Sequence, residues 1–109
     1  MLSIGELSRR TGVKVPTIRY YEETGLLEAA TRTAGNQRRY GHEQLEKLAF
    51  VRHARDLGFS LEAIRALIEL QDHPDRSCQE ANALARDQLA GVRARIRRLQ
   101  ALETELQRI

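Results

Sequence analysis

The sequence predicts a mainly α-helical protein, one small domain followed by a long helix, and three observations support this. Apolar residues recur at helical spacing in short segments that end at glycines, namely Gly12, Gly25 and Gly58. Residues 28–41 carry no helical period and contain the turn dipeptide Gly35-Asn36. From residue 79 to Ile109 the apolar residues follow a heptad pattern instead. A chain of 109 residues suits this organisation.

The composition favours a soluble protein with an anionic partner. Hydrophobic residues make up 41% and charged residues 30% of the chain. No run approaches the roughly 20 apolar residues that a membrane span needs, so no membrane partner is expected. The N-terminus lacks a secretory signal, so a cytoplasmic location is expected, and a single cysteine excludes an internal disulfide framework. The net charge is +3, and the whole excess of Lys and Arg lies in residues 1–58.

Residues 3–25 are predicted to form a helix-turn-helix. Ser3 and Glu6 have the spacing of a capping box, which opens the first helix. Gly12 can end that helix in a left-handed conformation, and Pro16 is tolerated in the first turn of the next. Two short helices joined by a tight turn that contains glycine define the motif.

A small wing and a second helical wing are predicted to follow. Residues 28–41 read as a hairpin with short strands at 31–33 and 38–40. Residues 42–71 read as two helices, the first over 42–57 and the second capped by Ser60. Residues 1–75 therefore form the predicted domain.

Residues 76–109 are predicted to form a coiled-coil dimerisation helix, with a capping box at Ser77 and Glu80. Its length of about 46 Å would exceed a compact domain of this size. An antiparallel pair would place the two N-terminal domains at opposite ends. The alternative is that the helix packs on its own domain. The heptad stripe consists of Ala85 with the predicted dimer contacts Leu89, Val92, Ile96, Leu99 and Leu106.

The start of the second helix carries the residue types that contact DNA. In a helix-turn-helix this helix lies in the major groove, and Lys14, Thr17 and Arg19 belong to its first turn or the next. An arginine there can bind guanine through two hydrogen bonds. Tyr20 is the better candidate for a phosphate contact, because Tyr21 shares a face with the apolar Ile18. The alternative is that Arg19 is a surface residue and both tyrosines pack in the core.

The wing repeats this pairing of arginine and tyrosine. Arg38, Arg39 and Tyr40 end the predicted hairpin, where they could contact flanking phosphates. The repetition favours DNA binding over simple packing.

The segments "IGELSRRTGV", "TIRYYEETGLL", "RTAGNQRRY" and "FVRHARDLGFSLEAI" occur in order, and with these the chain resembles the MerR family of bacterial transcription regulators. The resemblance implies a winged helix-turn-helix, a second helical wing and a long helix that pairs antiparallel in a homodimer. It also implies binding to a pseudo-palindrome in an over-long promoter spacer. Distortion of that double-stranded DNA in the activated state would allow RNA polymerase to engage both promoter elements.

The same resemblance implies roles for single residues. Arg19 matches the arginine that contacts a base, and Tyr20, Arg38 and Tyr40 match phosphate contacts. Arg55 matches a backbone contact from the second wing. Gln37 departs from the pattern, because many relatives have an aromatic residue there.

Cys78 stands at the predicted start of the long helix, where free amides, the helix dipole and the nearby Arg76 favour a thiolate. It could be a metal ligand, a redox thiol or a buried apolar residue. In MerR-like sensors a cysteine here is completed by ligands from a later loop of the opposite subunit, and cysteine at this position is typical of the divalent-ion branch. That loop would lie beyond Ile109, so we expect a shortened chain or a member without the sensor. No cofactor is expected in this chain alone, and a soft divalent metal ion is expected at Cys78 only if such a loop exists. His53 and His73 are weak candidates as further ligands.

The favoured function is a dimeric, sequence-specific DNA-binding regulator whose partners are promoter DNA, a second copy and RNA polymerase. The alternative is a helical dimerisation or adaptor module without effector sensing. An enzyme is disfavoured, because the sequence holds no Ser/His/Asp set, phosphate loop or carboxylate pair in a plausible cleft.

Overall fold

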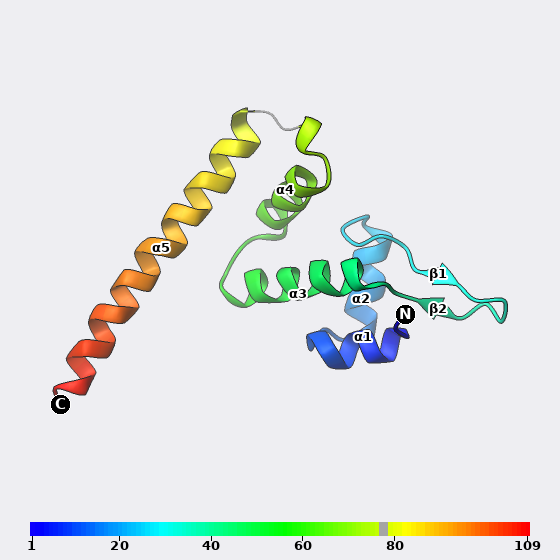
Figure 1. The fold of residues 1–109 in the computed structure, drawn as a ribbon, viewed down its shortest axis with the longest axis horizontal. Helices are drawn as coiled ribbons and strands as arrows, with labels where there is room; N and C mark the ends of the chain where they lie inside the picture. Colours follow the sequence, from blue (N-terminus) through cyan, green and yellow to red (C-terminus); the bar gives the residue numbers. More distant parts are fainter. Residues whose placement is uncertain (77–78) are drawn as a thin grey trace. The chain divides into compact units, whose positions relative to one another are not determined.

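A computed structural model describes residues 1–76 and 79–109, with residue 76 described by its backbone only (Figure 1). The mainly helical class with a small antiparallel hairpin is as predicted. By internal contacts the chain divides into two compact units, Met1–Ile68 and Glu69–Ile109, and each is described by itself. The elements in chain order are α1 (Ile4–Thr11), α2 (Val15–Glu23), β1 (Thr31–Arg32), β2 (Arg38–Arg39), α3 (His42–Asp56), α4 (Leu61–Asp72), a 3₁₀ turn (Pro74–Arg76) and α5 (Gln79–Gln107).

The predicted end signals of α1 are confirmed. The Ser3 hydroxyl accepts a hydrogen bond from the Glu6 amide at 3.1 Å, which satisfies one of the free amides of the first turn. Gly12 ends the helix with φ of 75°, and its amide donates to the Ser8 carbonyl at 2.8 Å.

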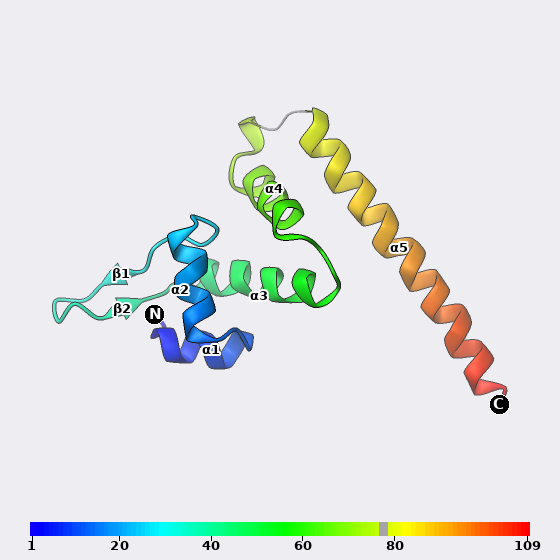
Figure 2. The same cartoon turned by 180° about the vertical axis from the view of Figure 1, so that it is seen from behind.

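Helix α2 begins directly after the turn. Lys14 is its N-cap residue and makes no capping hydrogen bond with its side chain, while Pro16 occupies the first turn. Ile18 and Tyr21 are buried on its inner face. α1 packs against both α2 and α3, α2 stands at a steep angle to α1, and the hairpin extends away from these helices (Figures 1 and 2).

The wing is a two-stranded ladder in which Thr31 faces Arg39 and Arg32 faces Arg38. Within the turn, Asn36 and not Gly35 adopts a positive φ of 64°. Both strands are shorter than predicted. The Thr33 hydroxyl accepts a hydrogen bond from the Gln37 amide inside the turn, and Tyr40 pairs with Leu2 through two backbone hydrogen bonds of 2.8 Å.

The core of the first unit collects side chains from α1, α2, α3 and α4 and from the end of the wing. Ser60 caps α4 as predicted, since its hydroxyl accepts from the Ala63 amide at 3.1 Å. The largest fully buried side chains are Tyr40, Leu7, Ile18, Leu48, Ile64 and Val51.

Helix α5 is continuous over 29 residues, and none of them is buried. Its heptad stripe is open to solvent in the single chain: Leu89 is 49%, Ile96 48%, Leu99 56% and Leu106 59% exposed. The predicted cap at Ser77 lies outside the described residues. No helix in the described ranges is long and apolar enough to cross a membrane.

Candidate nucleic-acid interface

The exposed side of α2 carries the predicted DNA contacts. Lys14 and Arg19 are exposed and Thr17 is partly exposed. Tyr20 is 53% exposed, whereas the neighbouring Tyr21 is 8% exposed and belongs to the core. The expected division between the two tyrosines is therefore confirmed, and Tyr20 remains available for an outside partner.

A hollow of about 490 Å³ separates the wing from the start of α1 and the exposed side of α2. Four arginines, Arg19, Arg32, Arg38 and Arg39, contribute to its lining together with Ser3, Ile4, Asn36 and Gln37. Among the described residues, none of these guanidinium groups forms an ion pair with a carboxylate. A cluster of uncompensated positive charges at an open surface attracts phosphate.

The hydrogen bonds of the wing arginines go to neutral groups. Arg32 donates to the Asn36 carbonyl at 3.2 Å, and Arg39 donates to the Arg38 carbonyl at 3.1 Å and to Gln37 Oε1 at 3.0 Å. Gln37, where the sequence departs from many relatives, therefore holds an arginine of the wing. Arg32 was missed by the sequence argument because it stands outside the "QRRY" cluster, on the facing strand.

The burial of Tyr40 argues against its predicted phosphate contact. Its side chain is fully buried, and the hydroxyl lies beside the Glu22 carboxylate, although Tyr40 Oη and Glu22 Oε1 make no hydrogen bond of good geometry in the described part of the chain. Burial and then the Glu22 carboxylate raise the pKa of Tyr40 well above its ordinary value, while Arg38 and Arg19 partly oppose this. In this conformation Tyr40 packs in the core beneath the wing and has no exposed atom that DNA could contact.

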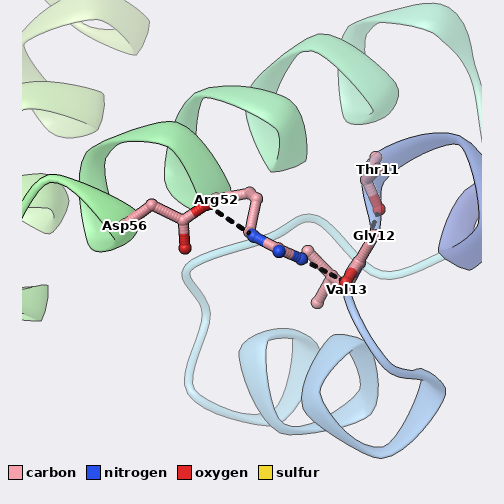
Figure 3. A network of polar contacts seen from close by, with 5 residues as sticks. All are labelled: Thr11, Gly12, Val13, Arg52 and Asp56. Atoms are coloured by element: carbon pink, nitrogen blue, oxygen red, sulfur yellow. Dashed lines mark hydrogen bonds and ion pairs between the residues drawn. The ribbon is translucent and has the colours of Figure 1, made fainter.

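The last turns of α3 carry two arginines with different surroundings. Arg55 is exposed and donates to the Phe59 carbonyl at 3.1 Å, so its charge remains available on the second wing. Arg52 points to the helix-turn-helix, where it contacts the Gly12 carbonyl, and it also pairs with Asp56 at 2.9 Å (Figure 3). Arg55 was a predicted contact from the sequence, whereas Arg52 was not.

The described residues contain no group of three or more His, Cys, Asp or Glu side chains that could hold a metal ion. Cys78 lies outside the described ranges. His53 is exposed on α3, and His73 lies 4.0 Å from Glu69. The described residues alone therefore do not supply the set of ligands that a metal centre needs.

Comparison with known proteins identifies the family. The profile of the MerR helix-turn-helix family of regulatory proteins matches residues 2–71, and a second profile, for the DNA-binding region of MerR, matches residues 45–109. The chain belongs to the MerR family. It is a DNA-binding transcriptional regulator and not an enzyme.

Its relatives include regulators named for metals. The transcriptional regulator ZntR of Escherichia coli is 44% identical over 110 residues, which cover 100% of this chain and 78% of that protein. The mercuric resistance operon regulatory protein of Shigella flexneri is 40% identical over 96% of this chain and 72% of its own. The structure of the regulator PbrR691 from Ralstonia metallidurans in complex with lead(II) superposes with a TM-score of 0.67 at 41% identity, covering 98% of this chain and 83% of that one.

Proposed function

We propose that this MerR-family protein binds a pseudo-palindromic promoter site as a homodimer and controls transcription by distorting that DNA, so that RNA polymerase can engage the promoter. The observation that supports this most strongly is the hollow between α2 and the wing. It presents four guanidinium groups that have no carboxylate partner among the described residues, beside the helix that enters the major groove in this fold.

The side chains divide by the groups that they can reach. Lys14, Thr17 and Arg19 at the start of α2 face base edges, and Arg19 supplies discrimination between base pairs. Phosphates are bound by Tyr20 on α2, by the wing and by Arg55 on the second wing. The wing contacts are Arg38, Arg39 and the additional Arg32. Because α2 alone touches few bases, specificity also depends on how easily the centre of the site deforms.

The stripe on α5 provides the dimer contact. In the single chain Leu89, Ile96, Leu99 and Leu106 are exposed and Val92 is partly exposed, and an antiparallel second copy would bury them. The adaptor alternative requires the same stripe but no DNA. Sedimentation of the protein with and without its selected duplex separates the two functions, since an adaptor forms dimers and leaves the duplex free.

The DNA function is tested with a duplex selected from a randomised library and a scrambled duplex of the same composition. Arg19→Ala should weaken the free energy of binding to the selected duplex by about 1–3 kcal/mol and relax the base preference at one base pair. The control Arg38→Ala removes the same charge from a phosphate contact, so it should weaken binding to both duplexes equally. It should also reduce the slope of log affinity against log salt concentration by about 1. Equal losses on both duplexes for Arg19→Ala would contradict the role in base recognition.

A response to a soft divalent metal ion would fit the names of the relatives. Cys78 would supply one thiolate, and the remaining ligands would come from residues other than those described, because thiolate sites for such ions need three or four ligands. Titration of the protein with zinc or lead against a chromophoric chelator tests this. Cys78→Ser should weaken binding, and an unchanged affinity would exclude Cys78 as a ligand.

A further inference from the structure

Two arginines of the second wing contact backbone carbonyls on either side of helix α2, one where α1 ends and one where α2 ends. Arg52 of α3 donates to the Gly12 carbonyl, in the turn that precedes α2. Arg65 of α4 donates to the Thr24 carbonyl at 3.0 Å, where α2 ends. These contacts join residues 40 and 41 positions apart, so they link separate elements of the first unit and not neighbouring turns.

The contact in the turn between α1 and α2 uses two nitrogens of the Arg52 guanidinium group. Arg52 Nε donates to Asp56 Oδ2 at 2.9 Å, which orients the group so that a terminal nitrogen meets the Gly12 carbonyl (Figure 3). Gly12 is held in the left-handed region at φ of 75°, and the next amide, that of Val13, donates to the Thr11 hydroxyl at 3.3 Å. Only an arginine can donate from two fixed directions in one plane, so lysine cannot reproduce both bonds.

The contact at the end of α2 satisfies a helix terminus. The last carbonyls of a helix have no partner within it, and the helix dipole places partial negative charge there. Thr24 is the residue that caps α2, and Arg65 brings a cation and a hydrogen-bond donor to its carbonyl. Arg52 and Arg65 therefore tie the turn before α2 and the end of α2 to the two helices of the second wing.

We propose that Arg52 and Arg65 are positioning residues for DNA recognition, which fix the recognition helix α2 to α3 and α4 so that it moves with the second wing. The inference rests on the proposed DNA function. It assigns to Arg52 a role opposite to that of Arg55, one turn further along α3. Arg52 directs its charge inward and sets where Arg19 meets the bases, whereas Arg55 directs its charge to a phosphate.

This contrast supplies a matched experiment. Arg52→Lys and Arg55→Lys make the same chemical change on the same helix and both keep the charge. Each variant of the full chain is titrated with the selected duplex and with the scrambled duplex over a range of salt concentrations. Arg52→Lys should lower the ratio of the two affinities about tenfold, because a hydrogen bond from a charged group contributes on that order. Its salt slope should not change, and Arg55→Lys should leave the ratio unchanged.

Two further variants keep the test independent of folding. Asp56→Asn retains Arg52 but removes the carboxylate that orients it, and should lower the ratio in the same direction. Arg65→Ala removes the contact at the end of α2 and should lower the ratio again when combined with Arg52→Lys. Thermal melting of each variant shows whether it is folded. If Arg52→Lys is unfolded, Asp56→Asn takes its place in the comparison with Arg55→Lys.

The outcomes separate the inference from the function on which it rests. An unchanged ratio in Arg52→Lys and Asp56→Asn would overturn the positioning role, and so would a loss that is equal on both duplexes, which would make Arg52 a phosphate contact. If the wild-type protein shows no preference between the two duplexes, the proposed function fails instead.

Discussion

The turn of the helix-turn-helix allows a sharp test of the contact between Arg52 and Gly12. Gly12 and Gly25 have nearly the same positive φ, 75° and 79°. A Cβ atom at Gly12 would lie 2.7 Å from a terminal nitrogen of Arg52, whereas a Cβ at Gly25 would meet no atom of the described residues within 4 Å. Alanine at each position therefore carries the penalty of a left-handed φ, and only the change at Gly12 also displaces Arg52.

The expected free energies follow from these contacts. The left-handed conformation costs an alanine about 1–2 kcal/mol at either position. Displacing Arg52 removes a hydrogen bond donated by a charged group. Because this side chain is partly exposed, we take the contribution of that bond to stability as about 1 kcal/mol. Gly12→Ala should thus lower the free energy of unfolding by about 2–3 kcal/mol in total, and Gly25→Ala by about 1–2 kcal/mol.

Urea denaturation at one fixed protein concentration measures both values, since the stability of a dimer depends on concentration. In a background of Arg52→Ala the two substitutions should cost the same, because the group that Gly12→Ala displaces is already absent. Equal costs of Gly12→Ala and Gly25→Ala in the wild-type background would refute the argument.

Three further predictions concern the cap, the core and the dimer. Ser3→Ala should lower the free energy of unfolding by about 1 kcal/mol, measured by urea denaturation, and an unchanged midpoint would contradict the capping role. Tyr40→Phe should lower the free energy of unfolding by less than about 1 kcal/mol at neutral pH and leave DNA affinity unchanged, because the buried hydroxyl makes no hydrogen bond of good geometry with any described residue. The raised pKa of Tyr40 means that the phenol ionises first in the unfolded chain, near its ordinary pKa of 10.0. Wild-type stability should therefore fall above that pH, and this loss should be smaller in the variant. Ile96→Glu should abolish the dimer in sedimentation, whereas Arg93→Ala, on a neighbouring exposed position, should preserve it.

Features that depend on a few consecutive residues could be predicted from the sequence. The caps at Ser3 and Ser60 and the left-handed Gly12 use hydrogen bonds that span at most four residues, so their spacing is visible in the chain. The same holds for the exposed Tyr20 beside the buried Tyr21, because helical periodicity separates consecutive side chains.

The features that the sequence argument missed depend on residues far apart in the chain. No local pattern pairs Arg52 with Gly12 or Arg65 with Thr24. Tyr40 was expected at the surface because it follows two arginines in "QRRY". Side chains alternate along a strand, however, and pairing with Leu2 directs Tyr40 to the core. A resemblance in sequence carries over the residue type but not the direction in which the side chain points.

The pairing of Leu2 with Tyr40 also has a practical consequence for handling the protein. The second residue of the chain is bonded to the base of the wing, and Met1, 77% exposed, contacts Thr31 on the outer strand. An affinity tag fused ahead of Met1 would extend from the surface next to the arginine-lined hollow. A purification handle there would compete with nucleic acid for the same space, and an acidic epitope would do so most strongly.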